Sequence, residues 1–226
     1  MPLLGISLIC AAAAFAQPAA IPTERNIWLE VHKRQIAKAG QNGADIMFVG
    51  DSITAGWDTN GAKVWARHMA PRRAANFGIS GDKTEHVLWR LQNGALSEKI
   101  RPKVVVLMIG TNNILRDDAQ GIADGISAII KEIHLRAPSA KVLLMGIFPR
   151  SEKPDAANRG KVAAVNKIIS QFENGRDVAY LDIGGKFIQP DGTINREIMY
   201  DFLHLTHAGY QLWADAIDDK LSALLE

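Results

Sequence analysis

The sequence predicts one α/β domain in which helices cover both faces of an open parallel sheet, a three-layer α/β/α sandwich. Short apolar runs without polar alternation recur along the chain, as in strands that are buried on both faces. Segments with apolar residues at helical spacing separate these runs, and this alternation is typical of parallel strands joined by helical crossovers. The composition, 47% hydrophobic and 22% charged, is that of a globular chain and excludes a disordered or fibrous protein.

Five apolar runs are predicted to be the strands of this sheet. Residues 45–50 end in a glycine, and residues 103–109 are followed directly by one. The other three runs are 74–77, 141–147 and 177–181. No linker, internal repeat or low-complexity stretch follows residue 20, so residues 21–226 are expected to form one domain.

Five segments between and beyond the strands are predicted to be helices. In residues 23–38, apolar side chains recur at helical spacing, and Gly40 follows as a stop signal. Three further segments, 84–91, 122–135 and 159–172, show the same periodicity. Thr206 is a suitable N-cap for a last helix near the end of the chain.

The first twenty residues are expected to form an export signal. They contain no charged side chain, and Leu3 to Phe15 is an apolar run about as long as the hydrophobic region of a signal peptide, too short to span a bilayer. Ala14-Phe15-Ala16 has the small-x-small pattern of a cleavage site, so Gln17 would begin the mature chain. Because Lys and Arg are absent from this segment, an N-terminal helix or a misplaced start codon stays open. The expected location is secreted or periplasmic.

Charge and cysteine content exclude several other classes of protein. The formal net charge is only +2 and no run of Lys and Arg forms a stripe, so nucleic acid is not an expected partner. Cys10 is the only cysteine, which excludes an intramolecular disulfide and a multi-cysteine metal site. After residue 20 no apolar run approaches the length of a membrane-spanning helix, so stable membrane insertion is not expected.

Glycine and polar residues follow three of the predicted strands. These segments are Gly50-Asp51-Ser52, Gly78 to Asp82, and Gly110 to Asn113. Open parallel sheets bind ligands beyond the carboxyl ends of their strands. The three segments therefore predict a functional site at that edge of the sheet.

The residue types at these ends suit nucleophilic catalysis. Ser52 can attack a carbonyl carbon if a base takes its proton, although a serine after a strand is also a common helix N-cap. His204 is the candidate base, and Asp201, three residues earlier, can orient the imidazole. The pair also fits an ordinary turn at a helix start. His207 lacks metal-ligand spacing and is interpreted as a residue of the first helical turn.

Acyl transfer also needs hydrogen-bond donors for the negative charge that develops on the carbonyl oxygen. The backbone N–H groups of Ser52 and Gly81 and the side-chain amide of Asn112 are the candidates. Each has an ordinary alternative, since glycines favour turns and asparagines form Asx-turns. Their occurrence after three different strands favours a shared oxyanion hole.

At four places the sequence resembles the SGNH hydrolases, also called GDSL-type esterases. Phe48 to Ile53 resembles the nucleophile block, and Asn76 to Asp82 resembles the glycine block. Gly110 to Asn113 resembles the asparagine block, and Asp201 to His204 resembles the final Asp-x-x-His block. Ile53 and Asn113 replace the usual Leu and Asp, which leaves the reacting groups in place.

The closest subgroup is the catalytic subunits of intracellular platelet-activating-factor acetylhydrolase and their bacterial relatives. The segments that resemble it are His86 to Leu91, Ile100 to Lys103, Asp191 to Ile194 and Met199 to His204. Ser80 stands where these subunits tend to have Gly, so a different conformation of the glycine loop at this position stays open.

This resemblance implies specific residue roles. It implies Ser52 as nucleophile, His204 as general base and Asp201 as the residue that orients it. It also implies an oxyanion hole made by Ser52, Gly81 and Asn112. It further implies a flavodoxin-like fold with a five-stranded parallel sheet, no metal or organic cofactor, and a homodimer.

The expected function is a serine esterase that hydrolyses short acyl esters, most of all acetyl esters, with carbohydrate O-acetyl groups as the first candidate substrate and a lipid or simple alcohol ester as the second. Activity should fail below a pH near 6 to 7, where an ordinary imidazole becomes protonated. An acyltransferase with the same residues and a non-catalytic carbohydrate-binding protein are the alternatives. Trp57 and Trp65 either pack in the core, as buried tryptophans usually do, or line a pocket.

Overall fold

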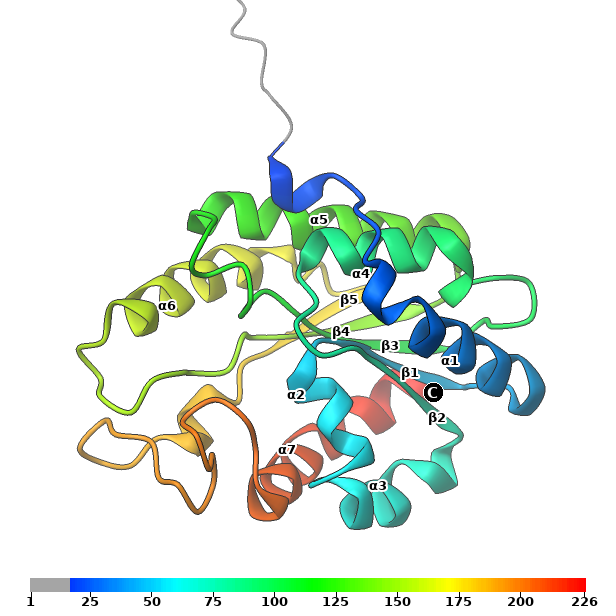
Figure 1. The fold of residues 1–226 in the computed structure, drawn as a ribbon. Coiled ribbons are helices and arrows are strands. Elements are labelled where there is room, and N and C mark those ends of the chain that lie inside the picture. Colours follow the sequence, from blue (N-terminus) through cyan, green and yellow to red (C-terminus); the bar gives the residue numbers. More distant parts are fainter. Residues whose placement is uncertain (1–16) are drawn as a thin grey trace, which may run out of the picture.

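The computed structural model describes residues 17–226 as a five-stranded parallel sheet between two layers of helices (Figure 1). Most of the predicted leader, including the cleavage pattern and Cys10, lies outside the described residues. The strands are β1 (Ile46–Gly50), β2 (Ala74–Gly78), β3 (Val104–Met108), β4 (Lys141–Met145) and β5 (Val178–Leu181). All five predicted strands are confirmed, and their order, β2-β1-β3-β4-β5, is the flavodoxin-like order.

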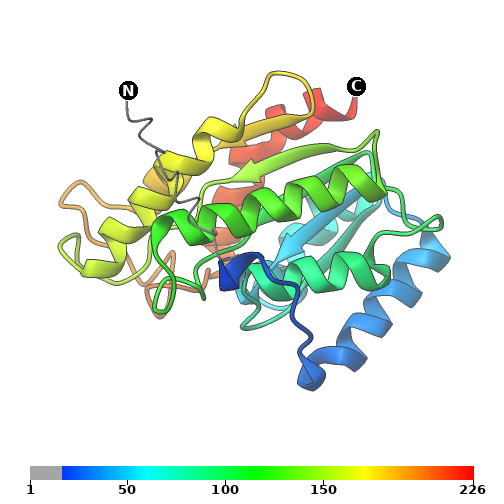
Figure 2. The ribbon, with the colours of Figure 1, turned by 90° about the horizontal axis from the view of Figure 1, so that it is seen from above.

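Helices cover both faces of the sheet, which confirms the three-layer prediction (Figures 1 and 2). One layer contains α1 (Leu29–Asn42), α4 (Thr84–Arg90), α5 (Ala119–Arg136) and α6 (Ala157–Ile169). The other contains α2 (Ser52–Ala55), α3 (Ala62–His68) and α7 (His207–Leu225). No helix within residues 17–226 is both long and apolar enough to cross a bilayer.

Alternate residues of each strand enter the two cores. In β1, Met47 and Val49 pack toward α4 and α5, while Ile46 and Phe48 pack toward α3 and α7. All four side chains are fully buried, as expected for a parallel strand that is covered on both faces.

An aromatic cluster fills the core beneath α3 and α7. Trp57 is fully buried, with its ring centre 5.0 Å from that of Trp213 and 4.6 Å from that of Tyr210. Trp65 packs partly buried against the same cluster. The core interpretation is therefore confirmed for Trp57, whereas Trp65 also lines a cavity of about 260 Å³ next to α1 and β2, which does not contain Ser52. The segment between them is mostly helical, formed by the turn Gly56–Asp58 and by α3.

The first long helix begins later than the sequence predicts. Periodicity indicated a helix from residue 23, but α1 starts at Leu29, after a single 3₁₀ turn at Asn26–Trp28. Residues 17–25, which we call the N-terminal arm, lie along α4 and α5 (Figure 2). The Thr23 N–H donates to the Glu85 carbonyl at 3.1 Å, so a tertiary contact replaces the helical bond. Tertiary pairing of the backbone here overrides helical periodicity.

Short helical turns complete the chain. Pro18–Ala20 forms one at the start of the N-terminal arm, where Ala19 is buried and its carbonyl accepts from the Thr84 hydroxyl at 2.7 Å. The others are Ala70–Arg72, Leu91–Ala95, Ser170–Phe172 and Gly184–Phe187.

Glycines at the strand ends allow the backbone to approach closely at the catalytic edge. A Cβ atom on Gly78 would lie 2.1 Å from the backbone nitrogen of Ala55, in the helix that follows β1. A Cβ atom on Gly50 would lie 2.3 Å from the Met108 carbonyl oxygen. Any larger residue would push α2 away from the sheet, since backbone atoms cannot rotate aside.

We expect Gly78→Ala to destabilise the fold by about 3 kcal/mol, because a backbone clash has no cheap relief. Gly40→Ala is the matched control. It lies in α1 with no atom within 4 Å of its Cβ position, and it should be neutral or stabilising by about 0.5–1 kcal/mol. Thermal unfolding of the two variants beside the parent chain measures the difference. Equal melting temperatures for both variants would contradict this account.

Candidate active site

The end of β1 places Ser52 at the carboxyl edge of the sheet. The strand ends at Gly50, and Ser52 is the first residue of α2. Asp51 is the N-cap, and its Oδ1 accepts from the Ile53 N–H at 2.9 Å. Because the cap belongs to Asp51, the Ser52 hydroxyl is not needed as a helix cap.

A tight loop before α7 carries His204 and Asp201. Met199 and Leu205 form an isolated antiparallel bridge that closes the loop, and Phe202 within it has a left-handed φ of +61°. Asp201 Oδ1 accepts from the His204 backbone N–H at 2.7 Å, and Asp201 Oδ2 lies 2.6 Å from His204 Nδ1. The loop therefore holds the imidazole by its own carboxylate.

The predicted meeting of Ser52 and His204 is observed. Ser52 Oγ lies 2.9 Å from His204 Nε2, although 152 residues separate them in the sequence. Burial raises the pKa of Asp201, but hydrogen bonds from the His204 ring and backbone outweigh it and hold that pKa below its usual value. An ionised Asp201 can only accept, so Nδ1 carries the proton and Nε2 is free to accept from Ser52. This is the geometry of a serine activated by a general base.

The candidate oxyanion donors follow β1, β2 and β3, which are neighbours in the sheet. Within residues 17–226, no acceptor pairs with the backbone N–H of Ser52 or of Gly81. The Asn112 side-chain amide donates to the Asp82 carbonyl at 2.8 Å, next to Gly81, and so keeps a second N–H for a ligand. His207, as predicted, is simply the first residue of α7.

Asn113 is a structural anchor. Its Oδ1 accepts from the Thr84 N–H at 3.1 Å, and its Nδ2 donates to Asp117 at 2.8 Å. The departure from the family pattern at this position therefore ties the start of α4 to the loop after β3.

Ser52 and His204 open into a cavity of about 220 Å³. Its wall contains several small or polar residues, and the complete lining is Ser52, Ala55, Gly56, Thr59, Asn60, Ser80, Tyr200, His204, Leu205 and Tyr210. Tyr210 is buried in this wall and donates from its hydroxyl to the Ile53 carbonyl at 2.6 Å. Such a volume suits a small chemical group, since pockets for drug-sized ligands have volumes of about 300 Å³ or more.

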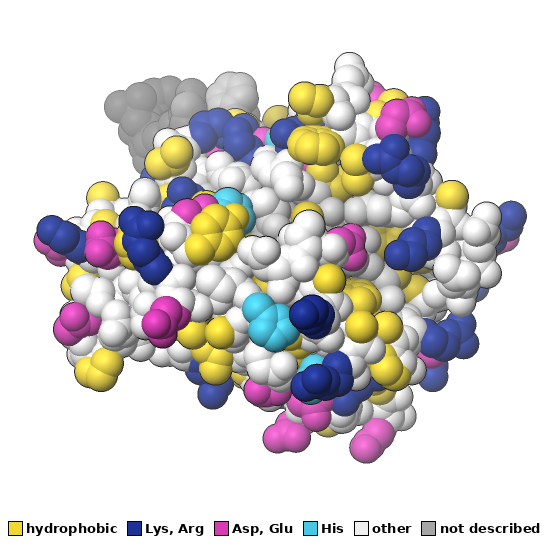
Figure 3. Space-filling model, turned by 60° about the horizontal axis from the view of Figure 1, so that its bottom comes forward, with side chains coloured by type: hydrophobic (Ala, Val, Ile, Leu, Met, Phe, Trp, Pro, Cys, Tyr) yellow, Lys and Arg dark blue, Asp and Glu magenta, His cyan; other side chains and the backbone are white. Residues whose placement is uncertain are grey.

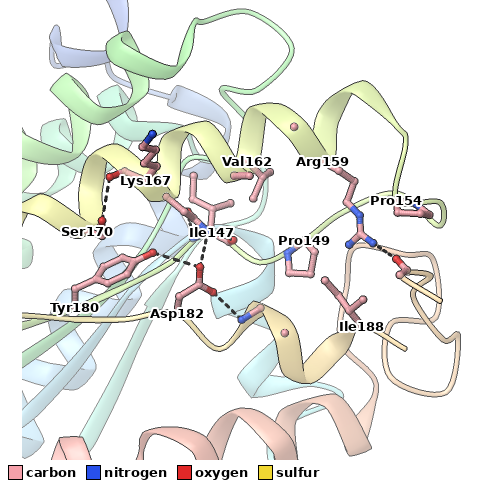
Figure 4. A pocket seen from close by; sticks show the side chains of 16 residues that line it. Ile147, Pro149, Pro154, Arg159, Val162, Lys167, Ser170, Tyr180, Asp182 and Ile188 are labelled. Carbon is pink, nitrogen blue, oxygen red and sulfur yellow. Dashed lines mark hydrogen bonds between the residues drawn. The ribbon is translucent and has the colours of Figure 1, made fainter. Parts of the chain in front are cut away.

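A larger cavity of about 700 Å³ lies beside α6 and contains neither Ser52 nor His204 (Figure 4). Its polar groups are largely paired with one another. Asn166 donates to Asp182 at 3.1 Å and to the Ile147 carbonyl at 2.9 Å, while Asp182 accepts from the Gly184 N–H at 2.8 Å. The reacting groups therefore converge in the smaller cavity, and chemistry rather than volume identifies the site.

The face that Figure 3 shows has a mixed distribution of charge. Lys and Arg side chains are interspersed there with Asp, Glu and hydrophobic side chains, and no stretch of one sign covers it. This agrees with the scattered charges in the sequence.

Asp51 is a buried carboxylate next to the nucleophile, to which the sequence motifs assign no role. The side chain is completely buried, and no group within residues 17–226 pairs with its Oδ2. Burial raises the pKa of Asp51 to about 7. The hydrogen bond from the Ile53 N–H opposes this rise, and the charge of Asp82 adds to it. Nothing in the sequence signals this burial, because a polar residue after a strand is ordinarily exposed.

Comparison with known proteins shows the family to which this chain belongs. The model of the GDSL-like lipase/acylhydrolase family matches residues 48–212. The chain belongs to this family. It is similar to the platelet-activating factor acetylhydrolase IB subunit alpha2 of Homo sapiens, with 39% identity over 218 residues that cover 93% of each chain. Family and relatives together make the protein a carboxylic ester hydrolase.

Solved structures of family members share the fold. A GDSL-like lipase from Bacteroides thetaiotaomicron matches with a TM-score of 0.70 and 19% identity, covering 85% of this chain and 97% of that one. Axe2, an acetylxylan esterase from Geobacillus stearothermophilus, matches with a TM-score of 0.63 and 17% identity, covering 80% and 94%.

The raised pKa of Asp51 predicts a pH dependence of stability. Between about pH 4 and pH 7 the unfolded chain releases this proton while the folded chain keeps it, so stability falls as pH rises through that range. Asp51→Asn cannot ionise and still accepts from Ile53. Its melting temperature relative to the parent chain should therefore be higher at pH 8 than at pH 4.5, by at least about 3 °C.

Asp155→Asn, at an exposed position, is the control for this measurement. Its melting temperature should follow that of the parent chain at both pH values. If the Asp51→Asn difference were the same at both pH values, Asp51 would not be the group that titrates.

Proposed function

We propose that the protein is a serine esterase that removes acetyl or similarly short acyl groups from carbohydrates through a covalent acyl-enzyme. The observation that carries this proposal is the continuous contact from Ser52 Oγ through His204 to Asp201, at 2.9 Å and 2.6 Å. Ester hydrolysis is the activity of the family, and this chain of contacts supplies the nucleophile and base for it.

In the proposed reaction, Ser52 Oγ attacks the ester carbonyl carbon while His204 Nε2 takes the hydroxyl proton. The carbonyl oxygen becomes an oxyanion next to the donors of Ser52, Gly81 and Asn112. When the intermediate collapses, the alcohol leaves with the proton from His204, and the acyl group stays on Ser52. Water then attacks the acyl-enzyme, giving its proton to His204, and the acid leaves as Ser52 recovers that proton.

The cavity and two relatives support the choice of substrate. A volume of about 220 Å³ walled by Ala55, Gly56 and Ser80 fits a short acyl group better than a long chain. Two solved structures of the same fold are named as an acetylxylan esterase and as a carbohydrate acetylesterase, Est24 of Sinorhizobium meliloti. A carbohydrate substrate outside the cell is consistent with the export signal expected from the sequence.

We further propose export with cleavage after Ala16. The small-x-small pattern at residues 14–16 supports this position. The N-terminal arm supports it too, since cleavage there would keep Ala19, which is buried and paired with Thr84, in the mature chain.

Replacing the nucleophile gives the direct test. Ser52→Ala should lower kcat for nitrophenyl acetate at least about 10⁴-fold, because the variant lacks the hydroxyl that His204 activates to form the acyl-enzyme. Ser170→Ala, on the turn after α6, should keep the parent rate. A Ser52→Ala protein with near-parent turnover would end the assignment.

A substrate and labelling panel separates the alternative functions. The parent protein should release acetate from acetylated xylan, acetylated chitooligosaccharide and nitrophenyl acetate, and a fluorophosphonate should label Ser52. Acetylated sugar formed in preference to free acetate, when unacetylated acceptors are added, would identify an acyltransferase. Glycan binding without labelling would identify a carbohydrate-binding protein.

Export is tested on protein made with its own leader in a bacterial host. The extracellular or periplasmic product should begin at Gln17, as read by N-terminal sequencing. A full-length product that stays in the cytoplasm would contradict export, and a product beginning at Ile21 would contradict the cleavage position.

A further inference from the structure

We propose that Arg25 is a positioning residue that locks the Ser80–Gly81 peptide in the orientation needed for the oxyanion hole. This inference rests on the proposed function, because it concerns the donor that Gly81 contributes there. Arg25 lies at the end of the N-terminal arm, before residues 48–212 that match the family model, and it approaches the glycine loop from the side of α1.

The first step is the turn that contains Gly81. The Asp82 N–H donates to the Ile79 carbonyl at 3.1 Å, so residues 79–82 form a β-turn. Gly81 has a φ of +76°, which is the third-residue conformation of a type II turn. In such a turn the central peptide, here Ser80–Gly81, can rotate to the type I arrangement, and glycine tolerates both. Rotation would point the Gly81 N–H to the opposite side.

The second step is the contact that opposes this rotation. Arg25 Nη1 donates to the Ser80 carbonyl at 3.1 Å. This carbonyl and the Gly81 N–H belong to the same peptide unit and point in opposite directions. Holding the carbonyl therefore fixes the N–H, and a hydrogen bond from a cation to the carbonyl also polarises the N–H into a stronger donor.

The third step is the anchor that holds Arg25 itself. Arg25 Nη1 also lies 3.1 Å from Asp82 Oδ1, and the Asp82 side chain is only 2% exposed. The other Asp82 oxygen accepts from Arg90 Nε at 2.8 Å. Arg90 in turn donates to the carbonyls of Phe77, at 2.9 Å, and Gly50, at 3.3 Å, at the ends of β2 and β1. Arg25 is thus connected, through Asp82 and Arg90, to the end of β1, two residues before Ser52.

The same turn also places the Asn112 amide, which donates to the Asp82 carbonyl. Two of the three predicted oxyanion donors therefore depend on residues 80–82. Arg25 is not needed to keep this region folded, since Arg90 still neutralises Asp82 and the arm keeps its contacts through Ala19 and Thr23. Loss of Arg25 should thus affect catalysis more than stability.

The test compares Arg25→Ala and Arg25→Lys with Arg34→Ala, an exposed arginine of α1, as the matched control. Arg25→Ala should lower kcat for nitrophenyl acetate about 10- to 100-fold, a part of what loss of a whole oxyanion donor costs. KM should stay within about twofold, and the melting temperature should fall by only a few degrees. Arg25→Lys, which keeps one charged donor, should recover part of kcat. Arg34→Ala should match the parent protein.

A double-mutant cycle with Asn112→Ala separates positioning from general destabilisation. If Arg25 acts on the shared turn, its effect on kcat should shrink in the Asn112→Ala background, while the changes in melting temperature add. An unchanged kcat in a folded Arg25→Ala protein would overturn the inference. Additive losses in kcat, or a rise in KM alone, would overturn it as well.

These outcomes are distinguishable from failure of the proposed function. Fluorophosphonate labelling of Ser52 in the parent protein reports on the nucleophile independently of Arg25. Labelled parent protein with no effect of Arg25 removes only the positioning role. Unlabelled parent protein, with activity that survives Ser52→Ala, removes the proposed function itself.

Discussion

The hydrogen bond between Ser52 and His204 imposes the strictest requirement on this fold. It joins the end of the first strand to a loop that precedes the last helix, so nearly the whole chain must fold before it forms. The sheet meets this requirement by ending β1 in a glycine that α2 and β3 can approach closely. On the other side, α7 packs through Tyr210 and Trp213 against the aromatic core beneath β1. The contact thus depends on the close approach at the end of β1 and on the aromatic core that holds α7.

Charge around the site is arranged at a cost to stability. Asp82 and Arg90 are buried. Burial raises the pKa of Asp82 and lowers the pKa of Arg90, although the attraction between the two charges opposes both shifts. Pairs of this kind repay their desolvation only when further hydrogen bonds satisfy them. Here Arg90 uses its remaining donors on the carbonyls of β1 and β2, which connects the glycine loop to the sheet. The buried charges therefore contribute alignment of the loop more than stability.

The sequence predicted the fold well because its strongest signals are local. The apolar runs of β1, β3 and β4 and the Thr206 cap of α7 each follow from neighbouring residues. The positions of Ser52, His204 and Asp201 were found through their motifs. The predicted start of α1 was wrong because the Thr23 backbone pairs with Glu85. The contacts of Arg25 and the burial of Asp51 also arise from tertiary structure. Such features depend on distant partners that periodicity does not reveal.

Tyr210 has a consequence for how this enzyme could evolve. Its ring bounds the reaction chamber, and its hydroxyl also supports the helix that begins at Ser52. An ideal Cβ on Gly56 would lie 2.0 Å from that hydroxyl oxygen, so the two residues are matched in size. Replacing Tyr210 by a smaller residue to accept bulkier acyl groups would also remove the hydrogen bond to the Ile53 carbonyl, which supports the helix that carries Ser52. The other side of the chamber is no freer, because Tyr200 stacks on the His204 ring and Asn60 donates to the Leu205 carbonyl at 3.1 Å.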